Sequence, residues 1–393
     1  MSTSSTPPPR IYLDNAATSW PKPETVYDAV DNYLRNNGAP AARGVYAHAE
    51  QVNRQLEQTR VQLARLINAP RADQVLFGYS GTDSLNLALR GLLQPGDHVV
   101  TTVCDHNAVL RPLRALEKAG VIQVSRVGCD EAGRVAAREV IGALRPNTRL
   151  LAIVHASNVT GTVQPIEAIA AASADHPALL LVDGAQTVGH WPVDVQQLGC
   201  DLLAAPGHKG LLGPTGTSFL YAAPQALEKL QPLRWGGTGT ASDSDEPPRD
   251  APAAYEAGNA NVPGLLGLGA GIAYVAERSV KRIAAEAMSR VQELLAGLED
   301  LSHVVVYGAS IDDPQRVGVV SFNVQGFDPQ EVAVLFDQMA GIQVRAGFHC
   351  APRMHDALQT AELGGTVRVS FGPFNQTADV RRLLEVLSEL GSA

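Results

Sequence analysis

Short apolar runs alternate with amphipathic helical stretches through the middle of the chain, between residues 98 and 221. The expected strands are 98–103, 122–127, 150–156, 178–183, 202–205 and 217–221. The expected helices are 82–93, 107–119 and 166–173. This alternation indicates βαβ units, and the almost wholly apolar strands between 150 and 205 fit a sheet that is buried on both faces. We therefore predict an α/β fold built on a mainly parallel, doubly wound sheet.

The pattern changes after about residue 235. Residues 236–252 are rich in Gly, Ser, Asp and Pro, and we expect a surface loop there. An Ala/Leu-rich segment is then expected to form one long helical stretch, 262–298, before strands at 304–307, 319–324, 342–346 and 366–371 and helices at 329–339 and 377–390. This predicts a large domain over 11–258 and a small α+β C-terminal domain over 259–393, with roughly the first 20 residues of the large domain free to pack on the small one. Residues 1–10 are expected to form a disordered tail.

The composition excludes several classes of function. A formal net charge of −9 leaves no basic footprint for nucleic acid. We find no apolar run long enough and free enough of charge to suggest a membrane span. The four cysteines, Cys104, Cys129, Cys200 and Cys350, have no regular short spacing, so they do not indicate a disulfide framework. A reducing cytoplasmic location is therefore expected.

A lysine and an aspartate follow two of the expected strands. Asp183 ends the strand 178–183, and Lys209 comes shortly after the strand 202–205. Ligands of open α/β sheets bind at the carboxyl ends of the strands, so the two side chains are expected to meet there. A lysine amine can form a Schiff base with a cofactor aldehyde, and an aspartate can keep a ring nitrogen protonated. This pair therefore indicates pyridoxal phosphate chemistry.

Further polar residues fall at the same expected edge of the sheet. Gln186 and His208 lie beside the first pair, and His106, His155, Ser157 and Asn158 follow two other strands. Residues 79–82, Tyr-Ser-Gly-Thr, open a helix whose free amide groups suit a phosphate. Each of these residues alone also fits a structural role, such as a helix cap or a hydrogen-bonded histidine. Their joint appearance in this order favours a binding site.

Eight short segments between residues 12 and 371 form a recognisable set: YLDNAAT at 12–18, RGV at 43–45, HASNVTG at 155–161, DGAQ at 183–186, GHK at 207–209, EAG at 256–258, RAGFHCA at 345–351 and VRVSF at 367–371. Together they resemble the class V aminotransferase family of fold-type I pyridoxal phosphate enzymes, and within it the cysteine desulfurases. The resemblance covers nearly the whole chain. It implies a large cofactor-binding domain with the parallel sheet and a small C-terminal domain that carries the cysteine loop.

The resemblance also implies a role for each matching residue. Lys209 would bind the cofactor and move the substrate Cα proton, Asp183 would pair with the ring nitrogen, and His106 would stack on the ring. Hydrogen bonds near the ring hydroxyl would come from Asn158 and Gln186. The remaining implied roles are phosphate binding by Gly81, Thr82, His208 and, from the neighbouring subunit, Asn259, and substrate binding by Arg368, Asn15 and Arg345.

Cys350 separates the reactions that this scaffold supports. Its loop holds nearby positive or polarisable groups, which can favour a thiolate, although a free cysteine is often only a small buried apolar residue. By resemblance, the thiolate would attack the substrate sulfur and keep it as a persulfide while alanine is released. Only 17 residues, 351–367, separate Cys350 from Arg368, which resembles the short cysteine loop of group II desulfurases. A zinc site formed with His349 and His355 would lack a fourth ligand, so no metal is predicted.

Three positions depart from the family pattern. Pro206 stands where a serine commonly binds the phosphate, Asn259 replaces a threonine that normally reaches the neighbouring subunit's phosphate, and Tyr46 replaces a histidine. Because two phosphate partners are altered, we expect the cofactor to bind less tightly than is typical of the family.

The resulting hypothesis is a homodimeric, pyridoxal-5'-phosphate-dependent cysteine desulfurase that converts L-cysteine to L-alanine and passes the sulfur to an acceptor protein or a small thiol. L-selenocysteine is an alternative substrate. A C–S lyase, selenocysteine lyase, epimerase or aminotransferase on the same scaffold is the main alternative, because these reactions need Lys209 and Asp183 but not Cys350. A non-catalytic scaffold for sulfur-carrier proteins is a further alternative.

Overall fold

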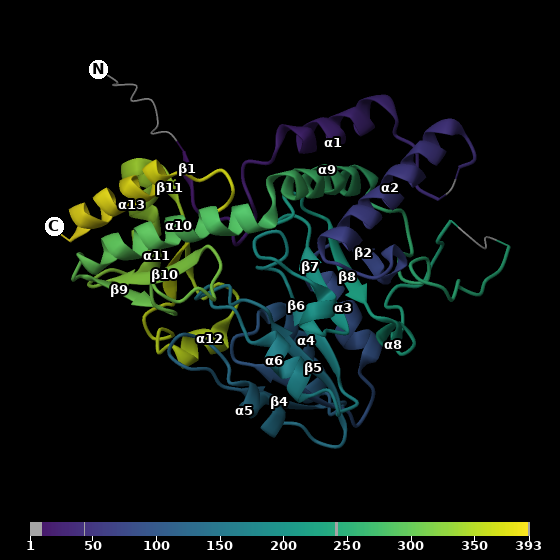
Figure 1. Cartoon of the computed structure of the whole chain (residues 1–393), viewed down its shortest axis with the longest axis horizontal. Helices are drawn as coiled ribbons and strands as arrows, with labels where there is room; N and C mark the ends of the chain where they lie inside the picture. The colour runs from purple at the N-terminus through teal and green to yellow at the C-terminus, as the bar shows by residue number, and fades with distance from the viewer. Residues whose placement is uncertain (1–9, 43, 240–242, 392–393) are drawn as a thin grey trace.

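The computed structural model describes residues 10–42, 44–239 and 243–391. The elements form a larger lobe, α1 to α9, and a smaller lobe, which comprises β1 and the elements from α10 to α13 (Figure 1). The small domain expected over 259–393 included α9 (Val262–Arg278), but the apolar side chains of this helix pack in the core of the larger lobe. The disordered tail expected at 1–10 lies outside the described residues except for Arg10. The loop expected at 236–252 has neither helix nor strand among its described residues, 236–239 and 243–252.

A seven-stranded sheet forms the centre of the larger lobe, in the order β2-β8-β7-β6-β5-β3-β4. Its strands are β2 (Val75–Gly78), β3 (His98–Thr102), β4 (Gln123–Val127), β5 (Thr148–Val154), β6 (Leu179–Asp183), β7 (Leu202–Pro206) and β8 (Ser218–Ala222). Neighbouring strands from β7 to β4 run parallel, while β8 is antiparallel to both β7 and β2. The chain enters β8 directly from the loop after β7, without a crossover helix, which explains the reversal. The predicted mainly parallel sheet is confirmed.

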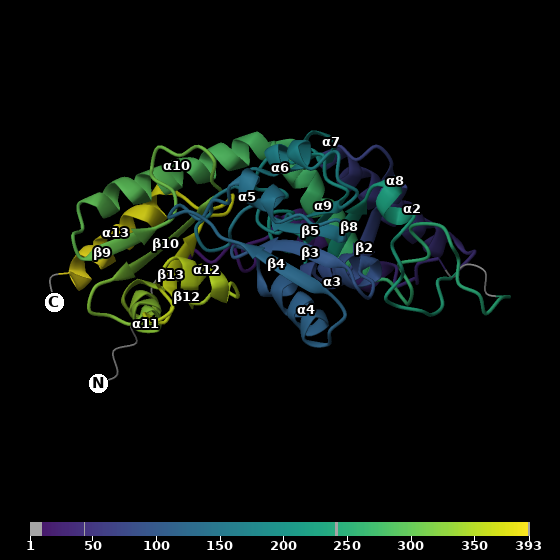
Figure 2. The same cartoon turned by 90° about the horizontal axis from the view of Figure 1, so that it is seen from below.

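Successive side chains of each strand point to opposite faces of the sheet, and both faces are buried. Along β5, Leu151 and Ile153 belong to one apolar cluster, and Leu150 and Ala152 belong to the other. The surrounding helices are α1 (Glu24–Asn36), α2 (Ala47–Leu66), η1 (Ala72–Gln74), α3 (Gly81–Leu92), α4 (Asn107–Lys118), α5 (Ala137–Gly142), α6 (Ile166–Ala172), α7 (Val195–Leu198), α8 (Pro224–Leu227) and α9 (Val262–Arg278). Figure 2 shows the β3–β5 region between α4 on one side and α5 and α6 on the other, which is the doubly wound arrangement.

The smaller lobe holds an antiparallel sheet in the order β12-β13-β10-β9. Its elements are α10 (Val280–Glu299), β9 (Val304–Tyr307), β10 (Val319–Val324), α11 (Pro329–Ala340), β11 (Ile342–Gln343), β12 (Arg345–Gly347), α12 (Pro352–Ala357), β13 (Thr366–Ser370) and α13 (Thr377–Leu390). The start of the chain also belongs here, since β1 (Ile11–Tyr12) pairs with β11 and Leu13 lies in the core of this lobe. The N-terminal segment therefore reaches the larger lobe from the smaller one.

Two expected elements are each divided in the structure. The helical stretch expected at 262–298 consists of α9 and α10, separated at Ser279, whose φ of 69° interrupts the helix. The single strand expected at 342–346 is wrong as well, because β11 pairs with β1 while β12 pairs with β13. In both cases the division lies at a residue that is neither glycine nor proline, so the local sequence carried no break signal.

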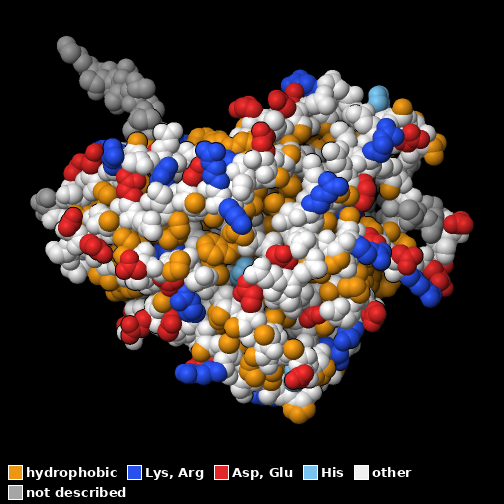
Figure 3. All heavy atoms as spheres, in the orientation of Figure 1, with side chains coloured by type: hydrophobic (Ala, Val, Ile, Leu, Met, Phe, Trp, Pro, Cys, Tyr) orange, Lys and Arg blue, Asp and Glu red, His pale blue; other side chains and the backbone are white. Residues whose placement is uncertain are grey.

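Charged side chains of both signs are spread over the surface. Lys and Arg side chains are interspersed with Asp and Glu over the face shown in Figure 3. Among the described residues, no helix is both long and apolar enough to cross a membrane.

Candidate active site

One cavity lies between the two lobes and collects most of the predicted site residues. It is lined by Gly81, Thr82, His106, Asn158, Asp183, Gln186, His208, Lys209, Arg345 and Arg368, together with Ala16, Ala17, Ser80 and Pro206. Three predicted site residues, Asn15, Cys350 and Asn259, lie outside this lining. The carboxyl ends of β5, β6 and β7 therefore meet residues from β12 and β13 at one place.

Lys209 lies in the turn after β7 and lines the cavity. Burial lowers the pKa of its amine from 10.5 to about 8; the Asp183 carboxylate raises it, and the Arg368 guanidinium lowers it further. A much larger fraction of this amine is thus neutral near pH 7 than for an exposed lysine. A neutral lysine amine can act as a nucleophile or a base.

Asp183 is the last residue of β6, and its register partner in β7 is Ala204. The sheet therefore fixes the carboxylate near the turn that carries Lys209. Its Oδ1 atom accepts a hydrogen bond from the Ala185 amide at 3.0 Å. Burial raises the pKa of Asp183, while that hydrogen bond and Lys209 lower it. A cationic group in the cavity would favour the ionised carboxylate.

His106 caps the N-terminus of α4. Its Nδ1 atom accepts a hydrogen bond from the Ala108 amide at 3.0 Å, which leaves the proton of the neutral ring on Nε2. Burial, followed by the charges of Lys209 and Arg345, lowers the pKa of His106 to about 4. The ring is therefore neutral near pH 7 and presents a flat, uncharged surface to the cavity.

The N-terminus of α3 forms another wall of the cavity. Ser80 caps the helix by accepting a hydrogen bond from the Asp83 amide at 3.1 Å, and Gly81 and Thr82 open the first turn. Amide groups of a first helical turn have no partner within the helix and attract anions. A Cβ atom on Gly81 would come within 3.2 Å of the Pro206 ring, so glycine allows close packing here.

The carbonyl oxygen of His208, the residue before Lys209, accepts hydrogen bonds from a nearby N-terminal segment. The donors are the Ser19 amide at 3.1 Å, the Ser19 hydroxyl at 3.0 Å, the Thr18 hydroxyl at 3.3 Å and the Lys22 amine at 2.8 Å. The Thr18 hydroxyl also contacts His208 Nδ1 at 3.0 Å. These contacts fix the backbone that carries Lys209. The sequence analysis missed Ser19 and Lys22, because nothing in their local pattern indicates this contact.

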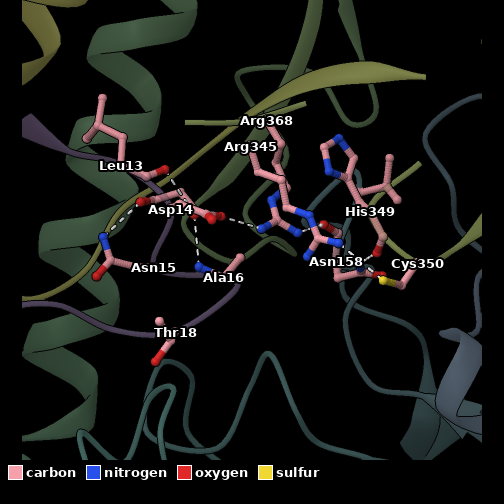
Figure 4. A network of polar contacts seen from close by, with 12 residues as sticks. Leu13, Asp14, Asn15, Ala16, Thr18, Asn158, Arg345, His349, Cys350 and Arg368 are labelled. Carbon is pink, nitrogen blue, oxygen red and sulfur yellow. Dashed lines mark hydrogen bonds and ion pairs between the residues drawn. The ribbon is translucent and has the colours of Figure 1, made fainter. Parts of the chain in front are cut away.

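The cysteine loop is held against the larger lobe. His349 and Cys350 both have positive φ angles, 46° and 62°. The His349 carbonyl accepts a hydrogen bond from the Asn158 amide at 2.6 Å, and the Cys350 carbonyl accepts one from the Asn107 backbone at 2.7 Å. Arg345 Nη2 lies 3.1 Å from Cys350 Sγ (Figure 4). Arg345 thus connects the Cys350 thiol to the cavity, and Asn158 connects the backbone of the loop to it; both residues line the cavity.

Arg368, in the centre of β13, is fully buried and forms an ion pair with Asp14 at 2.6 Å. Its Nη1 atom donates to the Asn158 carbonyl at 3.1 Å (Figure 4). The sequence analysis selected Asn15 from this segment, but the Asn15 amide donates to the Ser370 carbonyl at 3.0 Å. Figure 4 shows its side chain directed away from Arg368. Of the adjacent residues Asp14 and Asn15, it is therefore Asp14 that contacts Arg368, the arginine predicted to bind the substrate carboxylate.

Asn259, which is expected to reach a neighbouring subunit, is not part of the cavity lining. Arg43, from the RGV segment, is outside the described residues. The Asn259 carbonyl accepts a hydrogen bond from the Tyr79 hydroxyl at 3.2 Å, next to the start of α3. Tyr46 is exposed and lies immediately before α2.

The two histidines considered as metal ligands have other partners. His349 Nε2 lies 3.0 Å from the Thr366 hydroxyl, and His355 Nδ1 lies 2.8 Å from the Thr360 hydroxyl. Among the described residues, no group of three or more His, Cys, Asp or Glu side chains is arranged to hold a metal ion.

Sequence relatives share nearly the full length of the chain. It is 38% identical over 385 residues to a protein of Methanothermobacter thermautotrophicus named a probable cysteine desulfurase, which covers 97% of this chain and 94% of the relative. It is 33% identical over 389 residues to a cysteine desulfurase of Yersinia pseudotuberculosis, covering 97% of this chain and 93% of the relative.

The fold has close counterparts among solved structures. The apo structure of a cysteine desulfurase from Thermococcus onnurineus superposes with a TM-score of 0.90 at 32% identity, covering 98% of this chain and 95% of the other. A cysteine desulfurase from Escherichia coli gives a TM-score of 0.85 at 29% identity, covering 96% and 94%. A family model described as Aminotransferase class-V matches residues 11–383. The chain therefore belongs to the class V aminotransferase family.

Proposed function

We propose that this protein is a pyridoxal-phosphate-dependent cysteine desulfurase that converts L-cysteine to L-alanine and retains the sulfur as a persulfide on Cys350. The observation that carries the proposal is the contact between Cys350 Sγ and Arg345, a residue that lines the same cavity as Lys209. The curated relatives and solved structures described above carry the same activity in their names. An aminotransferase or an epimerase has no use for a thiol at this place.

The residues present fit the proposed cofactor. The buried atoms Asn158 Oδ1 and Arg368 Nε have no hydrogen-bonding partner within the protein, although both residues line the cavity. Unpaired buried polar groups are costly, which points to a polar ligand there. The first turn of α3 suits the phosphate, Asp183 suits a ring nitrogen, and the neutral face of His106 suits an aromatic ring. When bound, pyridoxal phosphate supplies an electron sink for the bonds at the substrate Cα.

The side chains divide the work of proton transfer and orientation. The Lys209 amine, with its pKa near 8, can take the proton from the substrate Cα and return one to the product. Asp183 would stabilise the positive charge of the ring nitrogen of the bound cofactor. Arg368 Nε is available to the substrate carboxylate, while Asp14 and the Asn158 carbonyl keep the guanidinium in place.

Cys350 performs the sulfur transfer. Its thiolate attacks the sulfur of the bound substrate, an S–S bond forms as the substrate C–S bond breaks, and the electron pair of that bond remains with the carbon product. Protonation of this product gives alanine, and Cys350 carries the persulfide. No external oxidant is needed. The Arg345 guanidinium, 3.1 Å from Cys350 Sγ, helps to hold the sulfur in position for this attack. An acceptor protein or small thiol then takes the terminal sulfur.

We further propose a cytoplasmic homodimer. Val45 and Trp235 are exposed apolar side chains near the start of α2 and in the 234–239 segment. The 234–239 segment lies beside the residues that precede α2, since a Cβ on Gly239 would come within 2.5 Å of the Ala42 carbonyl. A second copy of the chain would cover this surface and bring Asn259 close to the partner's cavity. A monomeric mass in light scattering at micromolar concentration would contradict the dimer.

The decisive experiment supplies the purified holoprotein with L-cysteine and measures alanine and the mass of the Cys350 peptide. We expect equimolar alanine and one added sulfur atom on Cys350 in a single turnover without acceptor. Alanine formation without sulfur on Cys350 would support a lyase instead. L-selenocysteine in a parallel reaction tests the wider substrate range.

A further inference from the structure

Two cysteines that the proposed reaction does not use lie opposite one another at the end of the large sheet. Cys104 comes two residues after β3, and Cys129 comes two residues after β4. The parallel register pairs Thr102 with Val127, and the Val103 amide still donates to the Val127 carbonyl at 2.9 Å. Continued by two residues, this register places Cys104 beside Cys129, with both side chains on the same face. Neighbouring strands lie about 5 Å apart, which is within the Cα separation of a disulfide.

The surroundings of the two thiols differ. Cys104 is fully buried, and its Sγ atom donates to the Gly133 carbonyl at 3.4 Å. Cys129 is partly exposed, and its Sγ atom lies 4.0 Å from the Met354 sulfur. The contact between the thiols raises the pKa of Cys104 and lowers the pKa of Cys129. Cys129 is thus both the more accessible and the more readily ionised of the two.

We propose that Cys104 and Cys129 form a reversible disulfide when the protein meets a peroxide. The Cys129 thiolate attacks hydrogen peroxide, breaks its O–O bond and becomes a sulfenic acid as hydroxide leaves. The Cys104 thiol then attacks that sulfur, an S–S bond forms, and water leaves. Two thiols and one peroxide give one disulfide and two waters, and a dithiol restores the reduced pair.

The position of the pair connects it to the cysteine loop. Met354, which contacts Cys129, lies in α12, and α12 begins two residues after Cys350. The end of the Met354 side chain also fills the space beside Gly133, because a Cβ atom on Gly133 would collide with Met354 Cε. Drawing the two sulfurs together to bonding distance removes Cys129 from Met354. We therefore expect the disulfide to loosen α12 and with it the loop that carries Cys350.

Cys200 provides an internal control. It is buried, its Sγ atom lies 3.9 Å from the Val195 carbonyl, and burial raises its pKa to about 12. A buried, protonated thiol reacts slowly with peroxide, so Cys200 should remain reduced under the same treatment.

The test uses the full-length holoprotein with Cys350→Ser, so that the loop thiol cannot react. Hydrogen peroxide is added, free thiols are alkylated, and peptides are mapped by mass spectrometry. We expect a linked peptide pair containing Cys104 and Cys129, lighter by two hydrogens and released by dithiothreitol, with Cys200 alkylated. Adding Cys104→Ser should leave sulfenic or sulfinic acid on Cys129 instead. Sulfinic acid on Cys129 with Cys104 still present, and no linked pair, would overturn the proposal.

Hydrogen exchange tests the connection to the loop. In the Cys350→Ser protein, amide exchange across α12 should become faster after oxidation and return to its original rate after dithiothreitol. The Cys104→Ser variant should show no such reversible change. If Cys104 and Cys129 become linked while amide exchange in α12 stays unchanged, the disulfide does not loosen the loop that carries Cys350. None of these readouts depends on desulfurase activity, so they are independent of the proposed function.

Discussion

The two sides of the proposed active site are built in different ways. Asp183 and Lys209 stand at or just beyond the ends of neighbouring parallel strands, where strand register fixes their positions. His349 and Cys350 stand in a loop with positive φ angles, a conformation that costs about 1–3 kcal/mol for each residue other than glycine. Hydrogen bonds from Asn158 and Asn107, on the other lobe, hold that loop in place.

This difference separates two requirements of the site. The side with Asp183 and Lys209, which we call the cofactor wall, depends on a rigid sheet and should tolerate changes in the smaller lobe. The side with His349 and Cys350, which we call the cysteine wall, depends on a few contacts between the lobes. It should respond to changes in either lobe. Variants that affect one wall and spare the other test this division.

Lys209→Ala should have the largest effect, because it removes both the proposed cofactor attachment and the proposed catalytic base. We expect turnover of L-cysteine to fall by about 10⁴-fold or more, together with the absorbance of lysine-bound cofactor. Lys281→Ala, at a lysine of α10 outside the cavity, is the control and should retain both properties. Retained turnover in Lys209→Ala would contradict the assignment.

Cys350→Ala should abolish persulfide formation by a similar factor while leaving cofactor absorbance and affinity unchanged. Only the cysteine wall is altered, so losing persulfide formation while keeping cofactor binding directly tests whether the two walls are independent. Cys129→Ala removes a thiol outside the cavity and should retain turnover. Equal loss of cofactor binding in Cys350→Ala would show that the two walls are not separate.

Asn158→Ala should affect the cysteine wall from the other lobe. Losing the 2.6 Å hydrogen bond to the His349 carbonyl removes about 1–3 kcal/mol of support from the loop. We expect iodoacetamide to alkylate Cys350 in the apoprotein with a rate changed about tenfold. Gln186→Ala, in the same cavity but bonded to the Ala16 carbonyl, should leave that rate unchanged. The same change in both variants would point to a general loosening of the cavity.

Capture of pyridoxal phosphate by the apoprotein should depend on pH through Lys209. Its pKa is lowered to about 8 from 10.5, so the neutral, nucleophilic amine accumulates as pH rises through 8. The capture rate should therefore rise several-fold between pH 7 and pH 9 and then level off. Stopped-flow absorbance measures this rate. A rate still rising steeply at pH 10 would show an ordinary lysine pKa.

Pro206→Ser should have the smallest effect. It restores the hydroxyl that the family commonly places beside the phosphate, and one hydrogen bond typically contributes about 0.5–1.5 kcal/mol net. We expect the cofactor dissociation constant to fall several-fold. Pro206→Ala, which removes the ring without adding a hydroxyl, should show no such gain. An unchanged constant in Pro206→Ser would show that the cavity already satisfies the phosphate.

The sequence predicted the parts that depend on local pattern. Apolar strands and amphipathic helices gave the parallel sheet, and residues after strand ends gave Asp183 and Lys209. It did not predict the antiparallel β8, the helix break at Ser279 or the division of 342–346. Each of these depends on a partner far away in the chain or on a backbone angle that the residue type does not signal.

The same limit applies inside the site. Arg368 was recognised by its motif, but its ion-pair partner, Asp14, is 354 residues away and was passed over for the adjacent Asn15. The contact of Lys22 with the His208 carbonyl spans 186 residues. Tertiary contacts of this range leave no periodic signature in a single sequence.

The N-terminal segment has a consequence for how the protein is made. Residues 11–22 leave the ribosome early, yet Ile11 bonds to the Gly341 carbonyl, and the Leu13 carbonyl accepts from the Ser370 amide. Those partners are synthesised only after all strands of the large sheet, the last of which is β8. The nascent chain must therefore hold its beginning unpaired while the large sheet folds, and the last strands complete the cavity. A ribosome stalled before residue 340 should carry a folded sheet that cannot yet capture substrate.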